Sequence, residues 1–111
     1  MSFYTKLDEL PWEPVRANLT TGVWGRTLLD GDTKAVYTRV EPGGEFRPHA
    51  DRYGHLMLVL SGKGTAQVAG KDLVLEAGTV TGIEPGELHS YRNTGEDDLV
   101  MVTLNLTVHQ P

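Results

Sequence analysis

The stretch that decides the fold is GGEFRPHADRYGHLMLVLSG, residues 43–62. It places His49 and Asp51 two positions apart, and it then runs from His55 into five apolar residues that end shortly before Gly62. Side chains two positions apart in an extended segment point to the same face, so His49 and Asp51 would face the same way. An imidazole at the head of an apolar strand lies at the wall of a core, where it needs a hydrogen-bond partner or a metal. The stretch therefore predicts a strand that begins at His55, with ligand-type side chains near its start.

Short β-rich runs continue on both sides of this stretch and are separated by Gly, Pro and Asp. Only one short helical turn fits before Pro11. About eight short strands without a long amphipathic helix are typical of an antiparallel sandwich or barrel, so we expect an all-β fold. Residues 1–14 would form an N-terminal segment and residues 15–111 a single domain. The expected strands are Val23–Leu29, Lys34–Val40, His55–Leu60, Thr65–Val68, Leu73–Leu75, Val80–Ile83, His89–Arg92 and Leu99–Thr107, and the turn signals between them include Pro42-Gly43-Gly44, Gly70-Lys71-Asp72 and Pro85-Gly86.

Composition excludes several classes of protein. A chain of 111 residues corresponds to one domain, and its formal charge of -5 without a basic cluster argues against nucleic-acid binding. The absence of cysteine excludes disulfide frameworks, zinc fingers and thiol catalysis. The longest apolar run is far too short to span a bilayer, and no signal-peptide-like segment opens the chain. We expect a cytoplasmic protein with no nucleic-acid or membrane partner.

Three of the four histidines fall where they could converge on a metal. His89 follows the turn at Pro85-Gly86 and begins another short strand, so it could meet His49, Asp51 and His55 inside a small barrel. Imidazole nitrogens with one carboxylate suit Fe, Mn, Ni, Co, Cu or Zn as divalent ions rather than Ca²⁺ or Mg²⁺. We therefore predict one divalent transition metal, its identity left open. The fourth histidine, His109, is expected in the C-terminal tail.

Two blocks of the chain resemble the two cupin motifs. The first block has Gly43, His49, Asp51, His55 and Gly62 at the family's spacing, and the second has Gly78, Glu84, Pro85, Gly86, His89 and Asn93. The resemblance implies a small single-domain cupin of the Cupin_2 type. Its fold would be an antiparallel double-stranded β-helix, or jelly-roll barrel, over almost the whole chain.

The chain departs from the family pattern at three positions. The family usually has His where Asp51 stands, Glu where His55 stands and Pro where Glu84 stands. The set of three histidines and one carboxylate is nevertheless kept, and some small cupins do have a histidine at the position of His55. Asp51 leaves alternatives open: it could bind the metal directly or through a water, or it could instead orient His49 from outside the metal's shell.

Two further side chains are expected at the cavity wall. Met57 shares a strand face with His55, and Tyr91 shares one with His89, so both would line the cavity if the ligands point inward. The alternative is that Met57 fills the core and Tyr91 packs with its hydroxyl hydrogen-bonded. No residue is assigned a catalytic role.

The cupin resemblance implies dioxygenases, isomerases, decarboxylases, lyases and non-enzymatic binders, because fold alone does not fix activity. The leading hypothesis is a small metalloenzyme that acts on an oxygen-rich small molecule, with the metal as a Lewis acid. The alternatives are a non-catalytic small-molecule binding or sensor protein and a degenerate barrel with an empty site. We also expect a homodimer formed through sheet edges, with the runs near Val23 and Leu99 as candidates.

Overall fold

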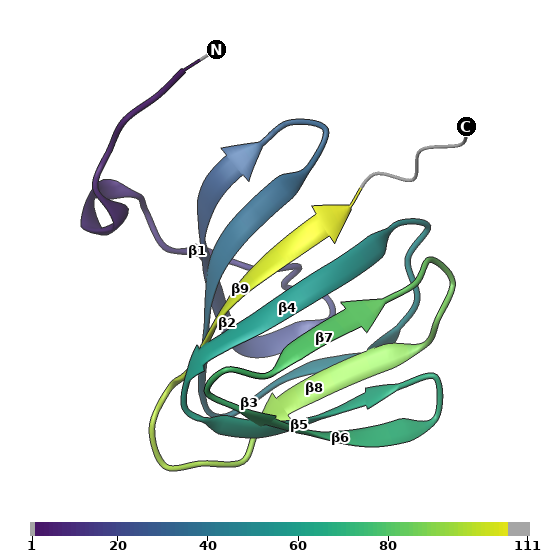
Figure 1. Ribbon diagram of the computed structural model, residues 1–111. Coiled ribbons are helices and arrows are strands. Elements are labelled where there is room, and N and C mark those ends of the chain that lie inside the picture. The colour runs from purple at the N-terminus through teal and green to yellow at the C-terminus, as the bar shows by residue number, and fades with distance from the viewer. Residues whose placement is uncertain (1, 107–111) are drawn as a thin grey trace.

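The computed structural model describes residues 2–106, and within them nearly every regular element is a strand (Figure 1). The all-β prediction is confirmed, and the helical turn expected before Pro11 is present as a short 3-10 turn. Thr107 and His109, which were expected in the last strand and in the tail, lie outside the described residues. The elements are η1 (Leu7–Glu9), β1 (Glu13–Pro14), β2 (Thr20–Asp30), β3 (Lys34–His49), β4 (Gly54–Ser61), β5 (Lys63–Val68), β6 (Lys71–Glu76), β7 (Val80–Ile83), β8 (His89–Asn93) and β9 (Leu99–Leu106).

One long strand, β3, joins the two layers of the barrel. Its first part, Lys34–Val40, pairs with β9, whereas its last part, from Glu45 to His49, pairs with β8. The resulting antiparallel order is β6-β5-β8-β3-β9-β4-β7, with β2 on β3 and β1 on β2. The sheet curls so that both layers face one interior, as Figure 1 shows. This is the jelly-roll arrangement that the cupin resemblance implied.

The turn expected at Pro42-Gly43-Gly44 is wrong, because these residues lie inside β3 and the strand continues to His49. Gly43 has a φ of +77°, a conformation that glycine adopts without a steric cost. A Cβ on Gly44 would meet the carbonyl oxygen of Glu41 at 2.8 Å, so the backbone is close-packed there. The glycines thus bend the strand from one layer into the other instead of reversing the chain, and this carries His49 to the barrel interior.

The core lies between the inner faces of the two layers. In β4 the inward side chains Met57 and Val59 are buried, while the outward Leu58 and Leu60 are exposed. This alternation follows from the two-residue period of a strand. Each fully buried side chain of this size contributes about 1.5–3 kcal/mol through the hydrophobic effect. The core consists of Val23, Val40, Phe46, Met57, Val59, Ala66, Val68, Leu75, Ile83, Tyr91, Leu99 and Met101.

Asn93, the last residue of the second motif block, has a structural role. Its side chain is 2% exposed, and its amide nitrogen donates hydrogen bonds to the carbonyl oxygens of Val40 and Asp97. Its amide oxygen accepts a hydrogen bond from the backbone N–H of Gly95. Asn93 therefore ties β8 to β3 and shapes the turn that leads into β9.

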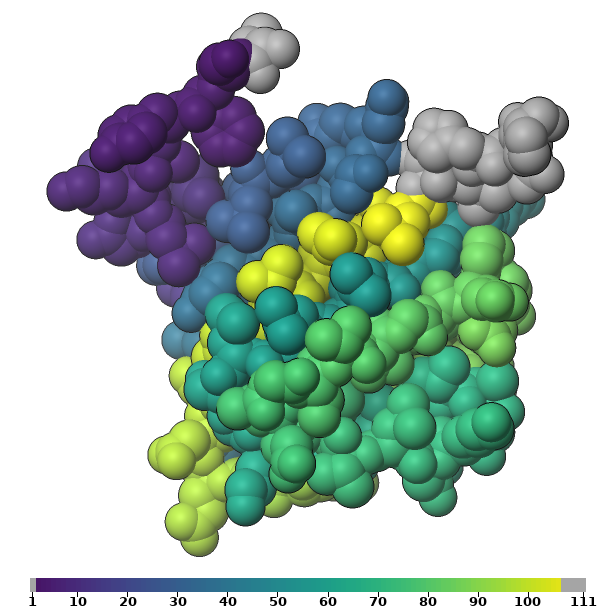
Figure 2. Space-filling model, viewed as in Figure 1, coloured from purple at the N-terminus to yellow at the C-terminus, as the bar shows by residue number. Residues whose placement is uncertain are grey.

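The N-terminal residues are fastened to the outer face of the barrel by Trp12. The guanidinium carbons of Arg26 and Arg39 lie 4.3 and 4.5 Å from the Trp12 ring centroid, which is cation–π geometry. Before this anchor, the exposed Phe3 and Tyr4 belong to an arm that projects from one corner of the molecule (Figure 2). After it, the chain pairs with β2 and leads to Arg16. No helix among residues 2–106 is long and apolar enough to cross a membrane.

Candidate metal centre

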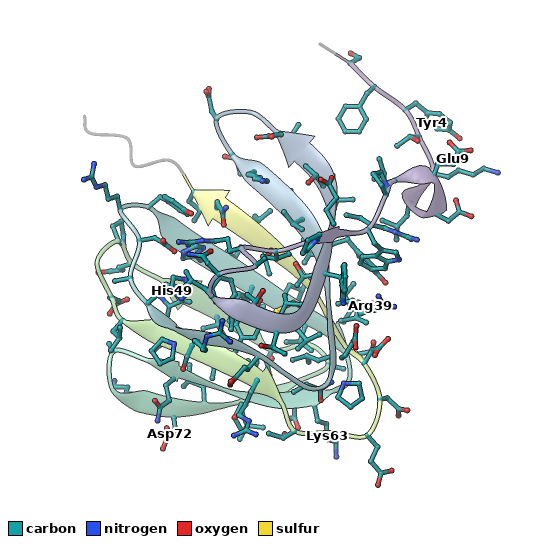
Figure 3. All side chains as sticks on the ribbon, turned by 180° about the vertical axis from the view of Figure 1, so that it is seen from behind. Tyr4, Glu9, Arg39, His49, Lys63 and Asp72 are labelled. Carbon is teal, nitrogen blue, oxygen red and sulfur yellow. The ribbon has the colours of Figure 1, made fainter. Side chains whose placement is uncertain are left out.

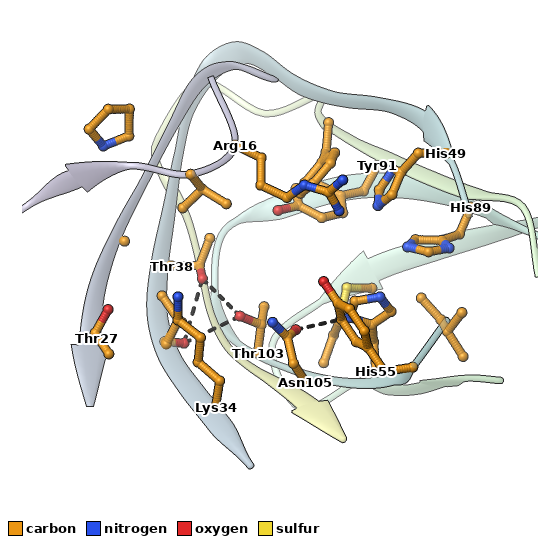
Figure 4. Close-up of a pocket in the computed structure, with 18 of the residues that line it drawn as sticks. Arg16, Thr27, Lys34, Thr38, His49, His55, His89, Tyr91, Thr103 and Asn105 are labelled. Atoms are coloured by element: carbon orange, nitrogen blue, oxygen red, sulfur yellow. Dashed lines mark hydrogen bonds between the residues drawn. The ribbon is translucent and has the colours of Figure 1, made fainter. Parts of the chain in front are cut away.

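The four predicted ligands come together at one end of the barrel. His49 ends β3, Asp51 lies in the connection to β4, His55 is the second residue of β4, and His89 begins β8. One potential ligand atom from each residue lies within 4.8 Å of the other three, so the group could hold a metal ion. His49 and His89 are also register partners on adjacent strands; Figure 4 labels both, and Figure 3 shows where His49 lies in the whole chain. The side chains of all four residues are only 6–13% exposed.

Each of the three imidazoles is oriented by a contact that it makes through Nδ1. His49 Nδ1 donates to the carbonyl oxygen of Arg47 at 2.9 Å, and His89 Nδ1 donates to that of Glu87 at 2.8 Å. His55 Nδ1 lies 3.0 Å from Asn105 Oδ1, which accepts its proton. A ring nitrogen fixed as a donor leaves the other nitrogen as the free ligand atom. The Nε2 atoms of His49 and His89 are therefore available to a metal, whereas His55 Nε2 is at hydrogen-bond distance from Asp51 and would exchange this contact for the metal.

These three Nε2 atoms face one oxygen of Asp51. Asp51 Oδ2 lies 2.9 Å from His55 Nε2, 3.2 Å from His49 Nε2 and 3.9 Å from His89 Nε2. Ligands about 2.1 Å from a shared ion stand roughly 3.0 Å apart at octahedral right angles and roughly 3.4 Å apart at tetrahedral angles. The distances from Asp51 Oδ2 to His55 and His49 are close to that range, whereas the distance to His89 exceeds it. Because His49 uses Nδ1 for a backbone carbonyl, Asp51 faces the ligand nitrogen of His49 and not its second ring nitrogen.

Arg16, like Asn105, is a polar residue of the site that the sequence does not predict. It lies between β1 and β2, and its Nη1 donates to Asp51 Oδ1 at 2.8 Å. Burial raises the pKa of Asp51, but the hydrogen bonds from Arg16 and His55 and the charge of Arg16 outweigh it, so the pKa is lowered from 3.8. The carboxylate is therefore held ionised, with one oxygen on Arg16 and the other toward the histidines.

Burial also sets the charge state of two histidines. Loss of hydration is the largest cause that lowers the pKa of His55 and of His89 below 6.5, and nearby positive charge acts in the same direction. At neutral pH the two rings are mainly neutral. The Nδ1 contact of His89 leaves its Nε2 lone pair free, whereas His55 Nε2 lies 2.9 Å from Asp51 Oδ2 in a hydrogen bond that a bound metal would replace. Neutral imidazole is the form that binds metals.

Aromatic rings hold the histidines from the side. Phe46 stacks on His49 with centroids 4.2 Å apart and an angle of 15° between the rings. Tyr53 meets His55 edge to face at 5.1 Å. Such packing restricts ring rotation, so the Nε2 directions are set by the apolar wall as well as by the Nδ1 hydrogen bonds.

A cavity of about 270 Å³ adjoins the histidines, as the close-up in Figure 4 shows. Met57 and Tyr91 line it, beside the three histidines. Tyr91 is 7% exposed, and burial raises the pKa of its hydroxyl. The rest of the wall combines apolar and polar side chains, among them Arg16, Lys34, Val36, Thr38, Phe46, Thr103 and Asn105. The volume is at the small end of ligand pockets in proteins.

A curled antiparallel barrel with three histidines and one carboxylate at its open end defines a small cupin-type protein. The sequence model of the cupin domain matches residues 36–106, well over half of the chain. The chain therefore belongs to the cupin domain family, as the two motif blocks indicated.

Solved structures share this fold over nearly the whole chain. A predicted oxalate decarboxylase from Thermotoga maritima is 24% identical with a TM-score of 0.86, covering 96% of this chain and 100% of its own. A cupin-like protein from the same organism is 28% identical with a TM-score of 0.77, covering 87% of this chain and 79% of its own. The polyketide cyclase RemF from Streptomyces resistomycificus is 20% identical with a TM-score of 0.86, covering 100% of this chain and 83% of its own. No curated protein sequence matches the chain.

Proposed function

We propose that this cupin binds one divalent transition metal through His49, Asp51, His55 and His89 and acts with it on a small, oxygen-rich molecule. One observation carries the proposal. Each of the three imidazoles has Nδ1 engaged by an oxygen acceptor, and each has Nε2 directed toward Asp51 Oδ2. Three lone pairs and an anionic oxygen at this separation repel one another unless a cation or protons lie between them.

The set of donor atoms restricts which metal ions the site would bind. Three nitrogens and one carboxylate oxygen favour Fe, Mn, Co, Ni, Cu or Zn as divalent ions, whereas Ca²⁺ and Mg²⁺ prefer oxygen ligands. Asp51 cancels one of the two positive charges, and Arg16 fixes the carboxylate from the other side. A bound ion would supply a Lewis-acid centre that polarises a substrate oxygen.

The chain's own residues prepare the cavity for such a substrate. Phe46, Met57 and Tyr91 form an apolar wall beside the histidines, which limits the access of water. Water exclusion strengthens electrostatic interactions inside a site. We propose dioxygenase-, isomerase- or lyase-like chemistry. A binding protein without turnover is the alternative, and no residue is assigned as a general acid or base.

Metal analysis tests the proposal first. Purified protein is expected to contain close to one equivalent of a transition metal by inductively coupled plasma mass spectrometry, and His89→Ala to lose it while keeping its circular dichroism spectrum. Thr65→Ala, on the adjacent strand β5, is the matched control. Full occupancy in His89→Ala would remove the site. O₂ uptake and substrate loss with diketones, flavonols and uronates then separate an enzyme from a binder.

A homodimer is part of the proposal, but the expected contact through sheet edges near Val23 and Leu99 is wrong. The strand of Leu99, β9, lies between β3 and β4, and β1 covers β2 beside Val23. Leu58 and Val80 are register partners on β4 and β7, and their side chains are 37% and 62% exposed on the outer face. Two neighbouring exposed apolar side chains of this kind support contact with a second copy. Light scattering after size-exclusion chromatography would show a dimer for the wild type and a monomer for Leu58→Lys with Val80→Lys. A monomeric wild-type protein would contradict the proposed homodimer.

A further inference from the structure

We infer that the cavity is built for an anionic ligand, whose carboxylate is bound by Lys34 and Asn105 while a second oxygen-bearing group reaches the histidines. The inference rests on the proposed function in one respect only, which is that the histidine end of the cavity holds a metal. The contact with Lys34 and Asn105 is a property of the chain itself.

The three side chains concerned lie in one row across three strands. Lys34 on β3 is the register partner of Asn105 on β9, and Asn105 is in turn the register partner of His55 on β4. All three line the cavity, so their side chains point to the same side of the sheet (Figure 4). Adjacent strands are about 4.8 Å apart, which puts the backbones of Lys34 and His55 roughly 10 Å apart with Asn105 between them. A small ligand can span this distance.

The ammonium group of Lys34 has no carboxylate partner in the described part of the chain. Among residues 2–106, no carboxylate lies within ion-pair distance of Lys34, whereas the guanidinium of Arg16 is paired with Asp51. Glu13 is the acidic side chain in the cavity lining, and it is exposed. The chain as a whole is acidic, with a formal charge of -5, yet Arg16 and Lys34 are both on this wall. A partly enclosed cationic wall favours anions.

Asn105 supplies donors next to that charge. Its Oδ1 is engaged by His55 Nδ1, which fixes the amide so that the NH₂ group is directed away from the histidine. Within residues 2–106, no acceptor for this NH₂ group is found. The hydroxyls of Thr38 and Thr103 are engaged with each other at 3.1 Å and with the carbonyl oxygen of Val36 at 3.5 Å. Beside these engaged hydroxyls, Lys34 Nζ and Asn105 Nδ2 are donors on neighbouring strands, a pair that suits a carboxylate.

Calorimetry with small dicarboxylates tests the inference. Malonate, succinate and glutarate, each compared with its neutral diamide, are titrated into wild-type protein and into Lys34→Met, which keeps most of the apolar stem. Lys34→Arg keeps the charge, and Lys71→Met removes the same charge from the exposed β5–β6 hairpin. At least one dicarboxylate should bind the wild type more tightly than its diamide. Its affinity should fall about tenfold or more in Lys34→Met, and only slightly in the two controls.

The outcomes separate this inference from the proposed function. Equal binding of dicarboxylate and diamide by the wild type, or equal dicarboxylate binding by wild type and Lys34→Met, would overturn the anionic ligand. Metal content is measured on the same samples, and its absence from the wild type counts against the proposed metal centre. The titrations are repeated on chelator-treated protein. There the carboxylate still meets Lys34 and Asn105, so the Lys34→Met comparison decides the inference with or without the metal.

Discussion

Arg16 Nη1 lies 2.8 Å from Asp51 Oδ1, and this contact joins residues that are 35 positions apart. The guanidinium carbon of Arg16 also lies 5.9 Å from the Phe46 ring centroid. Because the other oxygen of Asp51 faces the three histidines, Arg16 fixes the position of the carboxylate in the proposed metal centre.

Loss of this contact should weaken metal binding. In Arg16→Met the carboxylate loses its charged partner, and partners of this kind are worth about 10–100-fold in metal affinity. Competition with a chromophoric chelator measures the change. Arg52→Met removes an exposed arginine next to Asp51 in sequence and should bind metal like the wild type. Equal weakening in both variants would mean that general charge, and not the contact, is responsible.

Replacement of Asn105 should weaken metal binding, because Asn105 orients the ligand His55. In Asn105→Leu the Nδ1–H of His55 loses its acceptor, so the ring is free to turn and its Nε2 is less well directed. We expect metal affinity to fall about 10–100-fold. Asn18→Leu is the control, because Asn18 is exposed and contributes its backbone oxygen to the contact with Arg47. An unchanged chelator competition curve for Asn105→Leu would contradict this role.

The metal-free protein should become less stable on acidification. Burial lowers the pKa of His55 and His89 below 6.5, the value expected in the unfolded chain. The unfolded state then binds more protons, so stability is fully present above pH 6.5 and is lost as pH falls from there through the folded pKa values. Asp51, whose pKa is lowered from 3.8, adds a loss in the same direction at more acidic pH.

Urea unfolding of chelator-treated protein between about pH 8 and about pH 5 measures this effect. The unfolding free energy should decrease toward the acidic end, and His89→Gln should show a smaller decrease. A free energy that stays constant or rises on acidification would be incompatible with buried neutral histidines.

Gly62 should tolerate no side chain. Its φ is +89°, and a Cβ would clash with the carbonyl oxygen of Asp98 and lie 2.7 Å from the Cα of Leu99. Gly62→Ala should therefore destabilise the protein by about 2 kcal/mol or more in urea unfolding. Gly31→Ala is the control, since a Cβ there meets nothing within 4 Å and the φ is not positive. A stable Gly62→Ala would show that the loop relaxes.

The strands could be predicted from the sequence because their signals are local. The run Val80–Ile83 has the boundaries of β7, and the run that begins at His55 starts one residue inside β4. The Pro42-Gly43-Gly44 signal does not separate a turn from a bent strand, because glycine permits a positive φ in both. Only the pairing of β3 with both β9 and β8 shows that these residues form a bent strand and not a turn.

The ligand set could be proposed from motif spacing, but its supporting residues could not. His49, Asp51, His55 and His89 stand at fixed offsets that resemble the cupin motifs, and the structure brings them together. Arg16 has no such signal. Its position depends on the pairing of β1 with β2 and on the packing of Trp12 against Arg26 and Arg39, which are contacts between distant segments.

The pairing of His49 with His89 across β3 and β8 has a kinetic consequence. Because the two imidazoles are opposed in one ladder, an ion held by both would escape only when these strands separate or a ring turns against its packing. Its escape rate would then follow the local opening of the barrel rather than ligand exchange at an exposed surface. The rate at which a bound ion dissociates would therefore measure how often β3 and β8 separate at this end of the barrel.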